Sequence, residues 1–217
     1  MFSFFGKFIE LLASALEMLN GVFNNYGLAI IFFTLIIKFA LLPLTLKQTR
    51  SMKAMQDIQP EMKKIQDKYD DDKEKQQQEM MKLYQENDVN PAAGCLPMIL
   101  QLVILIPLYR SILSLQEVMG ESVFLWIGRL TDGSLAEPDP ALVIINGLAM
   151  VAQTFITQKI SGSGGQSSTM MWIMPIFIVF IGFQLPSGLL LYWLTSTVFT
   201  AVQQYVVSTD SGTKEAA

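Results

Sequence analysis

The stretch "GLAIIFFTLIIKFALLPLTL", Gly27–Leu46, is apolar over a length that can cross a lipid bilayer. A helix of about 20 apolar residues spans a hydrocarbon core about 30 Å thick. The one charged residue of this stretch, Lys38, lies well away from either end. Further apolar runs follow along the chain at Leu96–Leu115, Ala141–Thr157, Thr169–Phe183 and Ser187–Val207. The sequence therefore predicts an all-α integral membrane protein with five transmembrane helices.

The composition agrees with this fold class. Of the 217 residues, 51% are hydrophobic and only 16% are charged, and the apolar residues occur in blocks instead of a repeating pattern. The single cysteine, Cys95, excludes an intrachain disulfide. The chain has no histidine, which removes the commonest metal ligand and the commonest general base.

The fourth apolar run leaves the number of spans open. It is short, contains Pro175, and is separated from the fifth run only by "QLPSG", Gln184–Gly188. So short a link favours a helical hairpin with both ends on one side of the membrane. In an alternative with four spans, the fourth run is re-entrant.

Basic residues predict the orientation. Nine of the 15 Lys and Arg lie between Lys47 and Lys82, whereas the segment between the second and third runs holds only Arg129. Cytoplasmic loops carry the excess of Lys and Arg. We therefore expect residues 47–90 and the C-terminus in the cytoplasm and the N-terminus outside.

The two ends of the first apolar run adjoin segments of different kinds. Residues 1–25 predict an amphipathic helix lying at the outer interface, and the alternative is a signal peptide cleaved near "ASA", Ala13–Ala15. Residues 47–93 predict a cytoplasmic helical hairpin that breaks at Tyr69–Asp72. This hairpin is either a solvated spacer or a docking surface, whose residues would be Met52, Met55, Pro60, Met62 and Ile65.

The complete predicted order of segments follows from these patterns. It is an interfacial helix at 1–25, a span at 26–46, the hairpin at 47–93, a span at 94–115, an outer loop at 116–140, a span at 141–158, a flexible cytoplasmic loop at 159–168, spans at 169–184 and 185–207, and a short cytoplasmic tail at 208–217.

The sequence offers little for catalysis. No Asp or Glu lies in any of the apolar runs, and no GxxxxGK[ST] phosphate-binding loop is present. A Ser–Lys nucleophile would need a serine beside Lys38, and none occurs in Gly27–Leu46. We therefore expect no enzyme, no metal, no cofactor and no nucleotide.

Lys38 needs a different explanation. Placing a lysine at the centre of a membrane helix costs at least ~2.5–3.5 kcal/mol. Either its side chain reaches the cytoplasmic interface along the roughly 12 Å to Leu46, or it lies in a hydrated groove. Polar residues of the other runs favour the groove. In the fifth run, Gln203 lies on the same helix face as Tyr192, Thr195 and Ser196. The predicted groove residues are Lys38, Thr34, Gln101, Gln153, Thr157, Tyr192, Thr195 and Ser196.

Several ordered motifs resemble the YidC/Oxa1/Alb3 family of membrane protein insertases. The resemblance extends from about Tyr26 to Tyr205. It is carried by "YGLAIIFFTLIIKFALLPLTLKQTRSMKAMQDIQPEMKKIQDKY", "NPAAGCLPMILQLVILIPLYRSI", "FLWIGRL" followed by "PDP", and "PSGLLLYWLTSTVFTAVQQY". It implies a bacterial cell-membrane protein that inserts client transmembrane helices, alone or with the Sec translocon, through a groove holding one positive residue.

The resemblance also implies partners: nascent membrane proteins, the Sec translocon, the ribosome and membrane lipids. Lys38 stands where most bacterial members have arginine, which keeps the charge but loses the five-donor guanidinium. The end "STDSGTKEAA" lacks the basic tail that some members use on the ribosome, and the large outer domain of many members is missing. Lipoprotein-type members begin with a cysteine-bearing signal that has no counterpart near Met1.

Two rival functions remain open. One is a small-anion channel or transporter in which Lys38 is the selectivity charge. The other is an assembly chaperone that holds membrane-protein subunits without inserting them.

Overall fold

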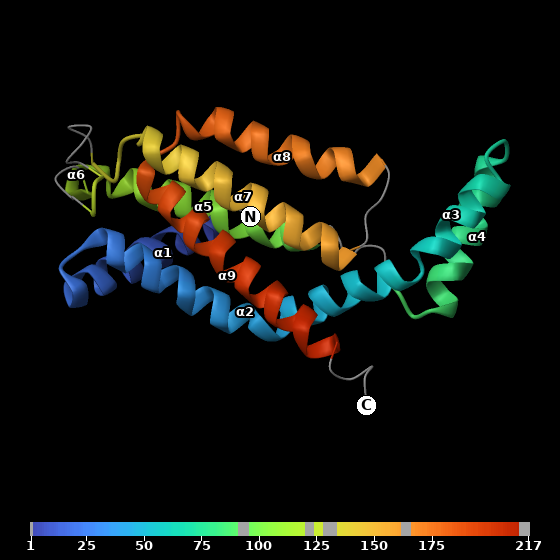
Figure 1. The fold of residues 1–217 in the computed structure, drawn as a ribbon. Coiled ribbons are helices and arrows are strands. Elements are labelled where there is room, and N and C mark those ends of the chain that lie inside the picture. The colour runs from blue at the N-terminus through green and yellow to red at the C-terminus, as the bar shows by residue number, and fades with distance from the viewer. Residues whose placement is uncertain (1, 91–95, 120–123, 128–133, 162–165, 213–217) are drawn as a thin grey trace.

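A computed structural model describes residues 2–90, 96–119, 124–127, 134–161 and 166–212 (Figure 1). These residues form helices, connecting turns and one isolated β-bridge, between Phe124 and Ile127. The prediction of an all-α chain is confirmed. The helices are α1 Phe2–Phe23, α2 Tyr26–Asp57, α3 Gln59–Lys68, α4 Lys73–Glu86, α5 Leu96–Ser114, α6 Gln116–Met119, α7 Pro140–Ser161, α8 Gln166–Gly182 and α9 Ser187–Gly212.

The long helices run lengthwise in one elongated bundle (Figure 1). α9 packs against both α2 and α7, α8 packs against α7, and α1 packs against α2 and α5. The short α6 lies at one end of the bundle, and α3 and α4 project from the other (Figure 1). We call these the α6 end, where α2, α7 and α9 begin, and the hairpin end, where α2 leads into α3.

Two helices of the described residues are long and apolar enough to cross a membrane. They are Tyr26–Asp57 and Pro140–Lys159, and Ile99–Ser114 is a shorter apolar helix. Only 28% of the 18-residue apolar stretch of Tyr26–Asp57 is buried within the protein, and only 22% of that of Pro140–Lys159. The core helix of a soluble protein would bury most of such a surface. The exposed side chains Phe32, Ile36 and Phe39 of α2 are therefore suited to contact lipid.

The helices extend past three of the expected boundaries. α2 continues beyond Leu46 to Asp57, because the intervening residues are good helix formers without glycine or proline. The loop expected at 159–168 is shortened by α7 and α8, and its residues 162–165 lie outside the described chain. α9 continues to Gly212, into the segment expected to be a tail.

α3 and α4 have a small apolar core of their own. Ile58, Leu83 and Val89 are buried there. α4 begins after the break at Tyr69–Asp72, where the Asp72 carboxylate accepts a hydrogen bond from the backbone N–H of Lys75 at 3.0 Å. This helix pair is therefore stabilised separately from the bundle.

The main core is confined to the α6 end. Its buried members on the bundle helices are Tyr26, Ile30 and Phe33 of α2, Leu108 and Ile112 of α5, Leu142 and Val143 of α7, and Leu189, Leu190, Leu191 and Tyr192 of α9. α1 adds Leu12 and Leu16, and the Ser111 hydroxyl of α5 donates to the Ile9 carbonyl at 3.0 Å. The apolar core therefore occupies only part of the length of the bundle.

Loop residues close the α6 end. The ring of Phe124 lies directly against Gly27, where a Cβ atom would overlap it. The backbone N–H groups of Ser187 and Gly188 donate to the carbonyls of Glu137 and Leu135, both at 2.8 Å. These contacts tie the start of α9 to the segment that precedes α7.

Candidate functional site

Polar side chains begin where the apolar core ends. On α2 the buried residues change from Phe33 to Thr34, and on α9 they change from Tyr192 to Ser196. Beyond these points the hairpin end carries polar groups on the facing sides of four helices. We call this set the polar seam: Lys38 and Thr45 of α2, Gln101 of α5, Thr157 of α7, and Ser196, Thr200, Gln203 and Gln204 of α9.

Lys38 occupies the part of the polar seam between α2 and α9. Its ammonium Nζ donates a hydrogen bond to the Thr200 hydroxyl at 3.1 Å. The Thr200 hydroxyl in turn donates to the Ser196 carbonyl at 2.8 Å. Within the described residues the ion pairs, Lys73–Asp70 and Lys82–Glu79, both lie in the hairpin. Among the described residues, the Lys38 charge thus has a hydroxyl partner and no carboxylate partner.

Side-chain hydrogen bonds join α9 to each of its polar neighbours. The Ser196 hydroxyl donates to Oε1 of Gln101 at 3.3 Å, which links α9 to α5. Thr45 of α2 donates to Oε1 of Gln203 at 3.0 Å. Thr157 of α7 donates to Oε1 of Gln204, also at 3.0 Å. Such contacts between membrane helices are worth only ~0.6 kcal/mol on average, so they leave the helices able to separate.

The hairpin end also contains polar groups without protein partners. Both amide atoms of Gln48, Nε2 of Gln101 and Nε2 of Gln158 are buried and make no hydrogen bond to any described residue. The Tyr192 hydroxyl, at the junction with the core, is in the same condition. Buried polar groups of this kind cost roughly 1–3 kcal/mol each unless a partner is supplied. This part of the bundle is therefore suited to water or to a polar chain.

The structure brings together some of the predicted groove residues and separates others. Hydrogen bonds join Lys38, Gln101, Ser196 and Thr157 to the seam, whereas Gln153 is half-buried on α7. Two others bond within their own helices: Thr34 donates to the Ile30 carbonyl and Thr195 to the Leu191 carbonyl. Tyr192 belongs to the apolar core and reaches the seam only with its hydroxyl.

Sequence reasoning missed Thr45, Thr200 and Gln204. Thr200 continues a four-residue spacing from Tyr192 through Ser196, so the helical period could have identified it. Thr45 lies at the end of the apolar run, where a polar residue does not stand out in the sequence. Gln204 continues the same four-residue spacing, and it accepts a hydrogen bond from Thr157 of α7.

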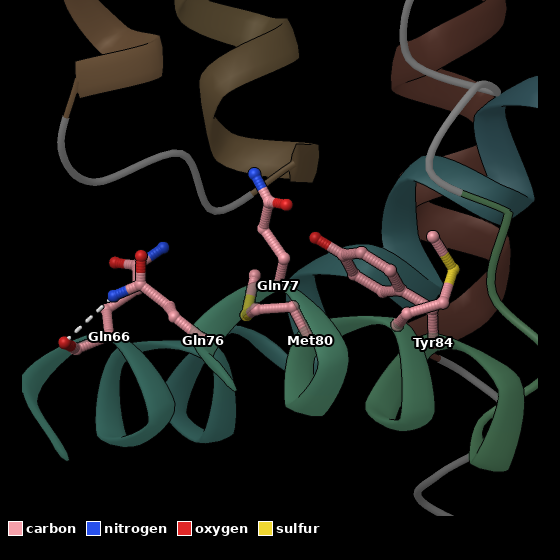
Figure 2. A pocket seen from close by; sticks show the side chains of 6 residues that line it. Gln66, Gln76, Gln77, Met80 and Tyr84 are labelled. Carbon is pink, nitrogen blue, oxygen red and sulfur yellow. Dashed lines mark hydrogen bonds between the residues drawn. The ribbon is translucent and has the colours of Figure 1, made fainter. Parts of the chain in front are cut away.

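The five residues predicted to form a docking surface on the hairpin differ in exposure. Met55, Met62 and Ile65 pack into its own core, Met52 is half-buried, and Pro60 is exposed in the first turn of α3. The exposed apolar surface is on α4 instead, where Met81 is 52% exposed. A hollow of about 350 Å³ lies there, lined by Gln66, Gln76, Gln77, Met80, Met81 and Tyr84 (Figure 2).

Figure 2 shows how this hollow is built. The side-chain amide of Gln76 donates to the Gln66 carbonyl at 3.0 Å and so joins α4 to α3. Burial raises the pKa of the Tyr84 hydroxyl above its usual range. The signal in the sequence was "EMMKLY", Glu79–Tyr84, whose adjacent methionines place apolar groups on two sides of a helix.

Comparisons with known proteins agree with the resemblance. Residues 18–214 match the family model described as 60Kd inner membrane protein. The membrane protein insertase YidC of Fusobacterium nucleatum is 42% identical over 202 residues, which cover 91% of this chain and 93% of that protein. The membrane protein insertase MisCA of Bacillus subtilis is 42% identical over 195 residues, covering 85% of this chain and 70% of that protein.

A solved structure also matches. It is a crystal structure of an active YidC insertase with its first transmembrane domain resolved. The TM-score is 0.72 at 32% sequence identity, and the match covers 92% of this chain and 46% of that one.

Proposed function

The chain belongs to the 60Kd inner membrane protein family, and from this premise we propose that it is an insertase of the bacterial cell membrane. Its clients are the transmembrane helices of nascent membrane proteins. The observation that carries the proposal is the Lys38 ammonium inside the helix bundle, bonded to a hydroxyl with no described carboxylate beside it. A partly buried charge without an opposite charge is unfavourable in a protein that only needs stability.

We propose that the polar seam is one wall of a hydrated groove open at the hairpin end. Thr34, Gln101, Gln153, Thr157, Tyr192, Thr195 and Ser196 contribute polar groups to it. Water in this groove shortens the apolar path that a client's polar tail must cross. The apolar core and the loop contacts at the α6 end close the other side.

Lys38 supplies the attraction in this mechanism. An acidic residue about 4 Å from an ammonium gains roughly 1 kcal/mol in water and roughly 4 kcal/mol near a protein surface. That range is enough to favour acidic tails without trapping them. The client's apolar helix then moves into lipid, driven by burial worth about 25 cal/mol per Å². This mechanism needs no nucleotide, and it leaves every residue of the chain chemically unchanged.

The topology of this proposal has five spans, formed by α2, α5, α7, α8 and α9. The N-terminus lies outside, and the hairpin and the C-terminus lie in the cytoplasm. The test uses Cys95→Ser with one cysteine added at Glu137 or at Asp71, both exposed positions. A membrane-impermeant thiol reagent applied to intact cells should modify the cysteine at 137 and spare the one at 71. The reverse labelling pattern would rule out this topology.

We propose that the hairpin is a docking surface for clients or for partners such as the Sec translocon and the ribosome. The exposed Met81 and the hollow beside it support this role. Met81→Gln should lower client insertion and leave the folded bundle intact, and Lys63→Gln on the exposed side of α3 is the control. If insertion by Met81→Gln equals that of the parent, the hollow takes no part in docking.

The experiment that tests the function is reconstitution. Vesicles containing only the purified protein should insert a purified single-span client, measured by protection of its translocated tail from protease. Vesicles without the protein are the control. An assembly chaperone would leave the client accessible. A small-anion channel, with Lys38 as its selectivity charge, would instead give a steady chloride flux in the absence of client.

A further inference from the structure

We infer that Thr200 is the positioning residue for Lys38: its hydroxyl holds the ammonium at the level of the groove where client tails are attracted. This inference rests on the proposed function and adds a second residue to its charge step. The inference follows from the geometry of three groups on two helices, α2 and α9.

The Thr200 hydroxyl is an oriented acceptor. Its proton is committed to the Ser196 carbonyl one turn earlier, at 2.8 Å. A hydroxyl has one donor and two acceptor lone pairs, so with its proton committed it can only accept from Lys38, 3.1 Å away. This back-bond also restricts the rotamer of a β-branched threonine in a helix. The oxygen therefore offers Lys38 a lone pair in a fixed direction.

The contact occurs at a defined level of the bundle. Phe39 and Phe199, the neighbours of Lys38 and Thr200 in the chain, pack edge to face with ring centroids 5.3 Å apart. This aromatic pair holds α2 and α9 in register independently of the hydroxyl. Removing the hydroxyl should therefore change the position of the ammonium without changing the helix contact.

The lysine itself explains why such a partner is needed. Its ammonium is a compact charge on a flexible stem, so one good acceptor decides where it lies. Without Thr200 the side chain is free to extend toward water at the hairpin end, as lysines near membrane interfaces do. The positive charge would then leave the inner part of the groove.

The experiment compares Thr200→Val with Thr200→Ser in reconstituted vesicles. The probes are two versions of one single-span client, with an acidic tail and with an uncharged tail. The readout is the ratio of insertion of the first to the second, per folded protein. Thr200→Val should lower this ratio about three- to tenfold, which corresponds to the usual net contribution of one hydrogen bond. Thr200→Ser keeps the hydroxyl and should give the same ratio as the parent.

A matched control separates this effect from a general loss of helix contacts. Thr154 of α7 makes the same bond to its own helix, to the Met150 carbonyl at 2.8 Å. Thr154→Val should leave the ratio unchanged. If Thr200→Val does not accumulate as folded protein, Thr200→Ala removes the same hydroxyl with less bulk and replaces it in the comparison.

Lys38→Ala distinguishes failure of the inference from failure of the proposed function. In that background Thr200→Val should have no further effect on the ratio, because the two residues act as one unit. If Lys38→Ala lowers the ratio but Thr200→Val does not, the inference is overturned and the charge step stands. If Lys38→Ala leaves the ratio unchanged, the charge step fails and Thr200 has nothing to position.

Discussion

The two ends of the bundle are built from the same helices but from different chemistry. At the α6 end, α2 and α9 meet through Ile30 and the residues around Leu190, which are fully buried. At the hairpin end the same two helices meet through Lys38–Thr200 and Thr45–Gln203. The two helices meet mainly through apolar side chains at the α6 end and through hydroxyl, amide and ammonium groups at the hairpin end. A single pair of helices can therefore be packed through apolar side chains along one part of its length and joined by weaker polar contacts along the other.

The difference follows from energetics. Burying a large aliphatic side chain is worth ~1.5–3 kcal/mol, whereas a polar contact between membrane helices averages ~0.6 kcal/mol. Contacts at the α6 end therefore fix the fold. Contacts at the hairpin end are individually weaker, so these helix surfaces can separate at a lower cost than those at the α6 end.

Removing a core side chain should give the largest effect on stability. Ile30 is fully buried at the α6 end, and Ile37 on the same helix is half-buried nearer the hairpin end. Ile30→Ala should lower the free energy of unfolding by about 2–5 kcal/mol because it leaves a cavity, and Ile37→Ala by less than about 2 kcal/mol. Unfolding by denaturing detergent in micelles measures both. Equal losses would contradict the claim that the α6 end contributes more to stability than the hairpin end.

Gly27→Ala should give an intermediate loss of about 1–3 kcal/mol by overpacking the closure at the α6 end. The added Cβ would overlap the ring of Phe124. That residue cannot shift easily, because its N–H and carbonyl both bond to Ile127. Gly21→Ala is the control, since nothing lies within 4 Å of its added Cβ. In the same unfolding assay, a Gly27→Ala protein as stable as the parent would show that Phe124 does not close this end tightly.

Thr45→Val should give the smallest effect, about 0.6 kcal/mol. It removes the hydroxyl that bonds Gln203 across the α2–α9 contact. Thr45→Ser keeps the hydroxyl and should match the parent. The unfolding assay used for Ile30→Ala measures both variants. A loss as large as that from Ile30→Ala would mean that polar contacts hold the hairpin end together.

The fold class could be predicted from the sequence because membrane helices need long apolar runs, and such runs are visible without any contact information. Helix ends were harder to predict: Lys47–Asp57 contains no glycine or proline that would end a helix, so α2 continues past the expected boundary. Lys38 stood out because a charge in an apolar run is costly. Thr200 did not, because its partner is 162 positions away in the chain and only the packing of α9 on α2 brings them together.

The hairpin shows the same limit. Met55, Met62 and Ile65, which the sequence predicts as docking residues, are partly buried against the hairpin core that contains Leu83. A helix pair outside the bundle needs its own core to remain folded, and the apolar residues of α3 are used for it. The exposed apolar surface of the hairpin is on α4, at Met81. Packing between α3 and α4 decides which helix has exposed apolar residues.

The most direct test of the central claim, that the hairpin end presents a positive charge to client tails, is a charge exchange between Lys38 and the tail. Insertion of one single-span client into reconstituted vesicles is measured with acidic, uncharged and basic tails. The parent and Lys38→Arg should insert the acidic tail best. Lys38→Ala should lose that preference, and Lys38→Glu should insert the basic tail best. Equal insertion of every tail by Lys38→Glu and the parent would contradict the claim.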